Sequence, residues 1–191
     1  MITYDDQGRA FWNGKRIPRT TEICSILAPR WQCAEYYLHK GQIIHTITEW
    51  EDTKELDESS VDPTLEGYLK AYREFKMIMA FIPVKIELQV YHPRYKYCGR
   101  IDRYGMFYQR RHSWVIDIKS GTPHESDLLQ APAYMFAMKE SGFPVEKCGD
   151  LYLKANGTFR FREVKNPTDK FLTFLTGIPR WREQNEIRGR T

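Results

Sequence analysis

An aspartate and a lysine stand two residues apart at the end of an apolar stretch. Asp117, Ile118 and Lys119 follow Trp114-Val115-Ile116, a run typical of a β-strand. Because side chains alternate across a strand, Asp117 and Lys119 share one face and Ile118 points to the other. A carboxylate and an ammonium on one edge can hold a divalent cation and a water beside a phosphate. The triplet alone is a weak signal, because Asp52-Thr53-Lys54 repeats its spacing in an acidic region.

A second carboxylate lies upstream of this triplet. Asp102 belongs to a predicted strand over 97–108, and antiparallel pairing of the two strands would bring Asp102 beside Asp117. Two such carboxylates repel each other unless a cation lies between them. Oxygen-rich sites of this kind suit Mg²⁺ or Mn²⁺. The alternative for Asp102 is a surface ion pair with Arg100 or Arg103.

Four further polar residues are candidates for the same site. Gln130 and Tyr134 are four apart on a predicted helix, so they share one face of it. His45 lies late in another predicted helix, where a lone histidine is more often structural than a ligand. Glu87 lies on an alternating strand, where the simpler interpretation is a solvent-facing side chain.

Taken in order, these residues resemble the motifs of the PD-(D/E)XK nuclease superfamily, in its RecB-like and phage-type exonuclease branch. Each motif is weak by itself, whereas five in the order and spacing of the family are hard to assemble by chance. The resemblance covers roughly residues 17–155. The matching positions are Gly41 and His45, Glu87, Gly99 and Asp102, Asp117 and Lys119, and Gln130 and Tyr134.

The resemblance implies a restriction-endonuclease-like α/β fold, with a mixed central β-sheet flanked by helices. It also implies that Asp102 and Asp117 bind Mg²⁺ or Mn²⁺. His45 and the carbonyl oxygen of Ile118 would complete the metal shell. Glu87 would lie at the edge of the site, as a ligand of a second metal or a residue behind the ligands.

The same resemblance assigns the catalytic roles. Lys119 would orient or deprotonate the attacking water and neutralise charge on the phosphate, while Gln130 and Tyr134 would brace the site and contact DNA. Pro132 departs from the pattern, because a proline inside a helix removes a hydrogen bond and can displace Tyr134. Some relatives carry an iron-sulfur cluster on cysteines near the C-terminus. Residues 149–191 contain no cysteine, so we expect no cluster.

The elements that position these residues follow from hydrophobic periodicity and from turn residues. A hairpin is predicted around Asn13-Gly14, and a second around Asn156-Gly157. Acidic residues 51–62 are predicted to form a solvated loop. Five helices are predicted: one that begins near Glu22 with Thr20 or Thr21 as its cap, one over 32–50, one that begins at Asp62-Pro63, one over 126–140 and one that begins near 166. The predicted strands cover 84–90, 97–108, 114–119, 151–153 and 159–161.

Length and composition limit the class of protein. The 191 residues suffice for one domain with a core, and 41% hydrophobic and 14% aromatic residues exclude a mostly disordered chain. No apolar run approaches the roughly 20 residues that span a bilayer, and no signal peptide is legible. The four cysteines lie far apart, as expected for buried thiols in a reducing compartment. We therefore expect a soluble, cytoplasmic protein (in the host cytoplasm if it is viral).

The formal charge of +4 is mild, but basic residues concentrate at 94–111 and in the tail, where they would follow a DNA backbone. Four aromatic residues are candidates for stacking on bases, namely Trp31, Tyr36, Tyr37 and Trp181, and the alternative is that most of them belong to the core.

These observations predict a single nuclease domain over residues 1–191. Its helical part would cover about 20–80, the catalytic sheet and helix about 84–165, and a C-terminal helix about 166–188. The predicted function is a metal-dependent DNA exonuclease that leaves 5′-phosphates, in phage or mobile-element DNA processing. Its partners would be DNA and a single-strand annealing or recombination protein. Two alternatives stay open: an endonuclease or structure-selective nuclease of the same fold, and a catalytically silent DNA-binding recombination partner.

Overall fold

The computed structural model describes residues 1–29, 35–108 and 112–188. Its main sheet has five strands in the order β4-β5-β6-β7-β8. Neighbouring strands are antiparallel except β6 and β7, which are parallel, so the sheet is mixed. The strands are β4 (Phe81–His92), β5 (Tyr97–Phe107), β6 (Ser113–Lys119), β7 (Lys147–Leu153) and β8 (Phe159–Glu163).

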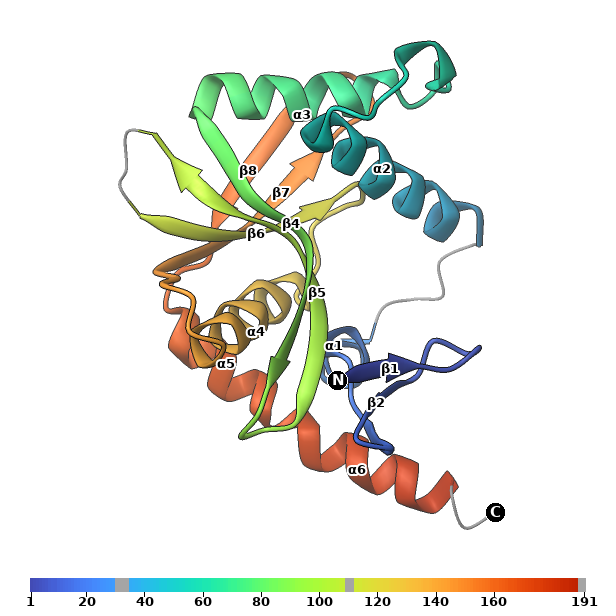
Figure 1. The fold of residues 1–191 in the computed structure, drawn as a ribbon, viewed down its shortest axis with the longest axis vertical. Coiled ribbons are helices and arrows are strands. Elements are labelled where there is room, and N and C mark those ends of the chain that lie inside the picture. Colours follow the sequence, from blue (N-terminus) through green and yellow to red (C-terminus); the bar gives the residue numbers. More distant parts are fainter. Residues whose placement is uncertain (30–34, 109–111, 189–191) are drawn as a thin grey trace.

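Helices cover both faces of this sheet (Figure 1). One face carries α2 (Glu35–Thr53) and α3 (Glu66–Met79), and the other carries α1 (Thr20–Leu27), α4 (Asp127–Glu140) and α5 (Pro167–Leu175). The last helix, α6 (Gly177–Arg188), packs against α1, and a short 3-10 helix, η1 (Glu58–Ser60), precedes α3. The predicted α/β class with a mixed sheet flanked by helices is confirmed. The order from β4 to β7, three strands, a helix and a strand, fits a restriction-endonuclease-like core.

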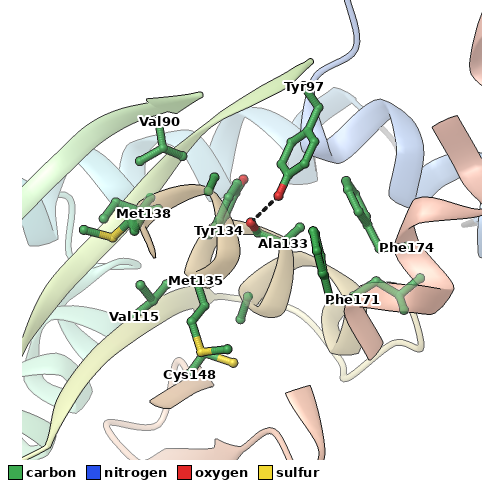
Figure 2. Close-up of a cluster of buried hydrophobic side chains, with 14 of the residues drawn as sticks. Val90, Tyr97, Val115, Ala133, Tyr134, Met135, Met138, Cys148, Phe171 and Phe174 are labelled. Carbon is green, nitrogen blue, oxygen red and sulfur yellow. Dashed lines mark hydrogen bonds between the residues drawn. The ribbon is translucent and has the colours of Figure 1, made fainter. Parts of the chain in front are cut away.

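Each face of the sheet has its own hydrophobic core. On the α4 face, Tyr97 and Phe174 pack beside the helix, and the Tyr97 hydroxyl donates a hydrogen bond of 2.7 Å to the carbonyl oxygen of Ala133 (Figure 2). On the α2 and α3 face, Phe75 contacts Phe107 and other aromatic rings from the sheet. Burial on both faces explains why β6 reads as a continuous apolar run.

A small sheet of β1 (Ile2–Tyr4), β2 (Ala10–Trp12) and β3 (Lys15–Ile17) precedes α1. The first predicted hairpin is β2–β3, and Asn13 and Gly14 both have positive φ, as its tight turn requires. The second predicted hairpin is β7–β8, where Leu153 pairs with Phe159. Both hairpin predictions are confirmed.

Three predictions about the helices near the N-terminus are wrong in detail. Residues 51–53 are not part of a loop but the last residues of α2. The first helix begins at Thr20 with Arg19 as its N-cap, and Thr20 donates its hydroxyl hydrogen to the Cys98 carbonyl oxygen. Asp62 caps a turn ahead of α3, accepting a hydrogen bond from the Thr64 backbone N–H at 2.8 Å.

The predicted C-terminal helix over 166–188 is two helices, α5 and α6. The first of them ends at Leu175 and the second begins at Gly177, where a Cβ atom would lie 2.6 Å from Ile23 in α1. Glycine is therefore needed for this close approach. No helix in the described ranges is long and apolar enough to cross a membrane. Residues 32–34 of the predicted second helix lie outside the described residues.

Candidate active site

Strands β5 and β6 separate at the candidate site. Their antiparallel pairing begins with Met106 opposite Ser113 and ends with Arg103 opposite Ile116. Asp102 is the next residue of β5 beyond this pairing, and in the same register it would lie opposite Asp117. Its carboxylate Oδ2 accepts a hydrogen bond of 2.5 Å from the backbone N–H of Ile118. A side chain thus replaces the backbone acceptor that β5 would have supplied, and it holds Asp102 against β6.

Three residues from three elements converge on Asp102. His45 of α2, Glu87 of β4 and Asp102 each offer a possible ligand atom, and these atoms all lie within 4.8 Å of one another. The His45 Nδ1 atom is 3.4 Å from Asp102 Oδ1. Sequence reasoning named all three residues, and the structure brings them together.

The backbone at Glu87 is unusual for a residue within a strand. Its φ is +48°, which lies in the left-handed region, and this conformation costs a non-glycine residue roughly 1–2 kcal/mol. The flanking residues Ile86 and Leu88 keep their pairing with β5. Because of this irregularity, the Glu87 side chain faces the site and not the solvent. The simpler interpretation, a solvent-facing side chain on an alternating strand, is therefore excluded.

Lys119, at the end of β6, lies within a second cluster of polar side chains. Its ammonium forms an ion pair with Asp117 Oδ2 and donates a hydrogen bond of 3.0 Å to Gln130 Oε1. The Gln130 Nε2 group donates to Asp117 Oδ1 at 3.2 Å and to the Tyr134 hydroxyl at 3.0 Å. Helix α4 continues through Pro132, so the spacing of Gln130 and Tyr134 is maintained.

Gly99 explains how α4 reaches this cluster. A Cβ atom at Gly99 would lie 2.3 Å from Cε1 of Tyr134 and 2.8 Å from the hydroxyl oxygen of Thr20. The bare backbone of β5 thus leaves room for the Tyr134 ring, whose side chain is buried. The glycine of the G-x-x-D motif therefore has a packing role here.

The electrostatics of the site reflect an excess of buried carboxylates. Burial raises the pKa of Asp117 to about 8, and the nearby Asp102 and Asp150 act in the same direction while Lys119 opposes them. Burial and the charge of Asp102 raise the pKa of Glu87 to about 7. Burial also raises the pKa of Asp102, but His45, Lys119 and the Ile118 N–H outweigh it, so the net value falls to about 2. The charge of Asp102 in turn raises the pKa of His45.

Sequence reasoning missed three buried residues around the site. Asp150 pairs with Asp117 across the parallel strands β6 and β7, and Asp127 accepts a hydrogen bond from Tyr152. Asp52 falls in the predicted acidic loop but belongs to α2, and its side chain is fully buried. A sequence signal existed for Asp150 alone, because it directly precedes the apolar run Leu151-Tyr152-Leu153.

Some residues expected to face DNA lie elsewhere. Arg103 is fully buried and forms an ion pair with Asp52, so it does not follow a DNA backbone, and Trp181 is also buried. Tyr36 and Tyr37 are 65% and 62% exposed. Trp31, Arg110, Arg111 and Arg190 lie outside the described residues, while Lys96, Arg94, Arg100, Arg180 and Arg182 are exposed. Cys24, Cys98 and Cys148 are buried, as expected for the thiols, and Cys33 lies outside the described residues.

Comparisons with known proteins find solved structures that are similar in part, and they find no family. No protein-family model and no curated protein matches this chain. An alkaline exonuclease from Laribacter hongkongensis (LHK-Exo) is similar over 90% of this chain and 92% of its own, with a TM-score of 0.44 and 10% identity. The structure of SSO0001 is similar over 58% of this chain, with a TM-score of 0.39 and 21% identity, and this chain covers 52% of its length. The assignment of the site rests on the geometry above.

Proposed function

We propose that the protein is a Mg²⁺- or Mn²⁺-dependent deoxyribonuclease that hydrolyses phosphodiester bonds and leaves 5′-phosphates. One observation carries the proposal. The possible ligand atoms of His45, Glu87 and Asp102 lie within 4.8 Å of one another, beside a lysine that is held by Asp117 and Gln130.

The chemistry of these donors fits a hard divalent cation. One imidazole nitrogen and several carboxylate oxygens match the preferences of Mn²⁺ and Mg²⁺. The raised pKa values of Asp117 and Glu87 arise from burial and from neighbouring negative charge, which a cation would compensate. His45, Glu87 and Asp102 would hold the metal, with Asp117 and the carbonyl oxygen of Ile118 completing the shell on the β6 side.

The roles of the side chains follow from their contacts. A divalent cation here would lower the pKa of a bound water and neutralise charge on the phosphate. Lys119 is oriented by Asp117 and Gln130, so its ammonium can position the attacking water or donate to the phosphate. Tyr134 is buried and its hydroxyl accepts a hydrogen bond from Gln130, so it holds the Gln130 side chain in place.

Replacing Lys119 or Asp117 with alanine tests this function. Either variant should lower Mg²⁺- or Mn²⁺-dependent degradation of linear DNA by at least roughly 100-fold, because each removes a group that acts on the reacting water or metal. The control is Lys154→Ala, at an exposed lysine after β7, which should degrade DNA at the wild-type rate. Circular dichroism checks that each variant is folded. Unchanged degradation by either site variant would overturn the assignment.

Within this function we propose exonuclease action on DNA ends, of the kind used in phage or mobile-element DNA processing together with a single-strand annealing or recombination protein. Support comes from the motif order that the chain shares with the phage-type exonucleases. Digestion of a linear duplex while a covalently closed circle stays intact is the expected result. Cutting of the circle would favour the endonuclease, and DNA binding without degradation in either metal would favour the silent binding protein.

A further inference from the structure

Arg103 is a fully buried arginine in direct contact with two of the candidate metal ligands. Its Nη1 group donates hydrogen bonds to Glu87 Oε1 at 3.3 Å and to the backbone carbonyl of Asp102 at 2.6 Å. The side chain has no solvent exposure. One guanidinium therefore connects the β4 side of the site with the β5 side.

The same guanidinium is held from α2 by Asp52. Its Nε group donates to Asp52 Oδ2 at 2.6 Å and to the Tyr72 hydroxyl at 3.1 Å. Asp52 also accepts a hydrogen bond of 2.8 Å from Lys76 Nζ and one from Tyr72, and its side chain is fully buried. Two residues of α3 thus orient the Asp52 carboxylate that contacts Arg103.

Helix α2 contacts neighbouring residues of β5 at two points. His45 and Asp52 are seven residues apart, which is about two helical turns, so they lie on the same face. His45 contacts Asp102, and Asp52 contacts Arg103, the next residue of β5. The contact at Asp52 therefore fixes the position and rotation of the helix that carries His45.

We propose that the Asp52–Arg103 ion pair is a positioning device that holds Glu87, Asp102 and His45 in a metal-binding arrangement. This inference rests on the proposed function of the site. Glu87 has a left-handed backbone that a strand does not favour, so the contact with Arg103 is needed to keep its carboxylate directed at Asp102. Groups that orient metal ligands from behind typically contribute 10–100-fold in metal affinity. An ion pair that only stabilised the fold would leave the metal affinity of the folded protein unchanged.

The test replaces both charges at once with Asp52→Leu and Arg103→Met. Removing one partner would leave an unpaired buried charge, whereas apolar replacement of a whole pair is often tolerated by the fold. The double variant should bind Mn²⁺ at least about tenfold more weakly in calorimetry. The Mn²⁺ concentration for half-maximal DNA degradation should rise by the same factor, with much of the rate regained at saturating Mn²⁺.

Arg103→Lys is a second variant that keeps the charge. A lysine ammonium cannot reproduce the fork that reaches Asp52, Glu87 and the Asp102 carbonyl together. We therefore expect Mn²⁺ affinity to fall in this variant as well, although the buried charge remains paired with Asp52.

A matched control breaks an ion pair that joins α2 to α3 and not to β5. Arg73 of α3 contacts Glu51 of α2 at 2.7 Å and also reaches Glu58, but none of these three residues is a candidate ligand. The Glu51→Gln/Arg73→Met variant should keep its Mn²⁺ affinity within about twofold of wild type even if its melting temperature falls. A tenfold loss in this control would mean that fastening α2 is sufficient, and it would overturn the positioning role.

Two results separate the failure of this inference from the failure of the proposed function. Wild-type Mn²⁺ affinity in a folded Asp52→Leu/Arg103→Met or Arg103→Lys variant would overturn the inference. The nuclease assignment would still hold in that case if the wild-type protein degrades DNA. A wild-type protein that neither binds Mn²⁺ nor degrades DNA would remove both.

Discussion

Buried carboxylates on three neighbouring strands determine the electrostatics of the candidate site. Asp102, Asp117 and Asp150 lie on β5, β6 and β7, and all three are buried. Asp150 forms an ion pair of 2.7 Å with Arg162 through Oδ2, but its Oδ1 atom is buried without a hydrogen-bond partner among the described residues. Burial raises the pKa of Asp150 to about 6, with Arg162 opposing the shift.

The raised pKa of Asp150 predicts a particular dependence of stability on pH. Because the folded state holds this proton more tightly than the unfolded chain, the associated stabilisation is fully present below pH 3.8 and is lost as the pH rises through about 6. Asparagine does not titrate. The stability of Asp150→Asn relative to wild type should therefore improve by up to about 3 kcal/mol between pH 4 and pH 8.

Urea denaturation in EDTA at pH 4, 6 and 8 measures this difference. Asp6→Asn, at an exposed aspartate, is the control for the exchange of aspartate for asparagine. A difference for Asp150→Asn that does not change with pH would contradict the argument.

At the scale of elements, β5 organises the site because its residues face partners on several sides. Asp102 reaches α2 and β6, Arg103 reaches α2, α3 and β4, and Gly99 admits the Tyr134 ring of α4. The separation of β5 from β6 beyond the Arg103–Ile116 pair leaves the Ile118 N–H to the Asp102 carboxylate. The position of one strand thus determines which side chains can meet.

The approach of β5 to α4 predicts the effect of Gly99→Ala. The added methyl group would overlap the buried Tyr134 ring and approach the Thr20 hydroxyl, so the variant should lose about 1–3 kcal/mol of stability. Displacement of Tyr134 should also disturb Gln130 and lower the rate of DNA degradation. Gly121→Ala, where a Cβ atom would meet nothing within 4 Å, is the matched control. Urea denaturation and end-labelled DNA assays would refute this role of Gly99 if Gly99→Ala matched wild type in both.

At the scale of the whole molecule, segments from the two ends of the chain pack together. Trp181 of α6 is buried, and the Arg16 guanidinium of β3 lies 5.2 Å from its ring centroid. Arg16 also donates a hydrogen bond to Asn185 of α6. The small N-terminal sheet and the last helix therefore support each other (Figure 1).

Trp181→Ala should therefore destabilise the protein although the residue is not part of the candidate site. Truncation of a buried tryptophan costs about 3–5 kcal/mol, which should appear as a lower urea midpoint. DNA degradation measured well below the unfolding temperature should stay at the wild-type rate. Leu172→Ala, at a leucine that is 56% exposed, should change stability by no more than about 0.5 kcal/mol. Equal midpoints for the two variants would argue against the packing role of Trp181.

The sequence by itself determined the features that depend on neighbours along the chain. The period of two in 114–119 and the four-residue spacing of Gln130 and Tyr134 predicted shared faces, because local backbone geometry repeats regularly in strands and helices. Asn-Gly pairs predicted both hairpins for the same reason. These patterns named Asp102, Asp117 and Lys119 as candidates, and the order of the motifs along the chain added His45 and Glu87.

Only the tertiary structure decided which of these side chains meet and what holds them. Asp52 reads as a solvated acid in the sequence, and Arg103 as one basic residue among several, because the cost of burying a charge depends on the partner that folding brings to it. The left-handed backbone of Glu87 and the pairing of Asp150 with Asp117 likewise arise from contacts between strands. Such contacts join residues far apart along the chain, so no local pattern records them.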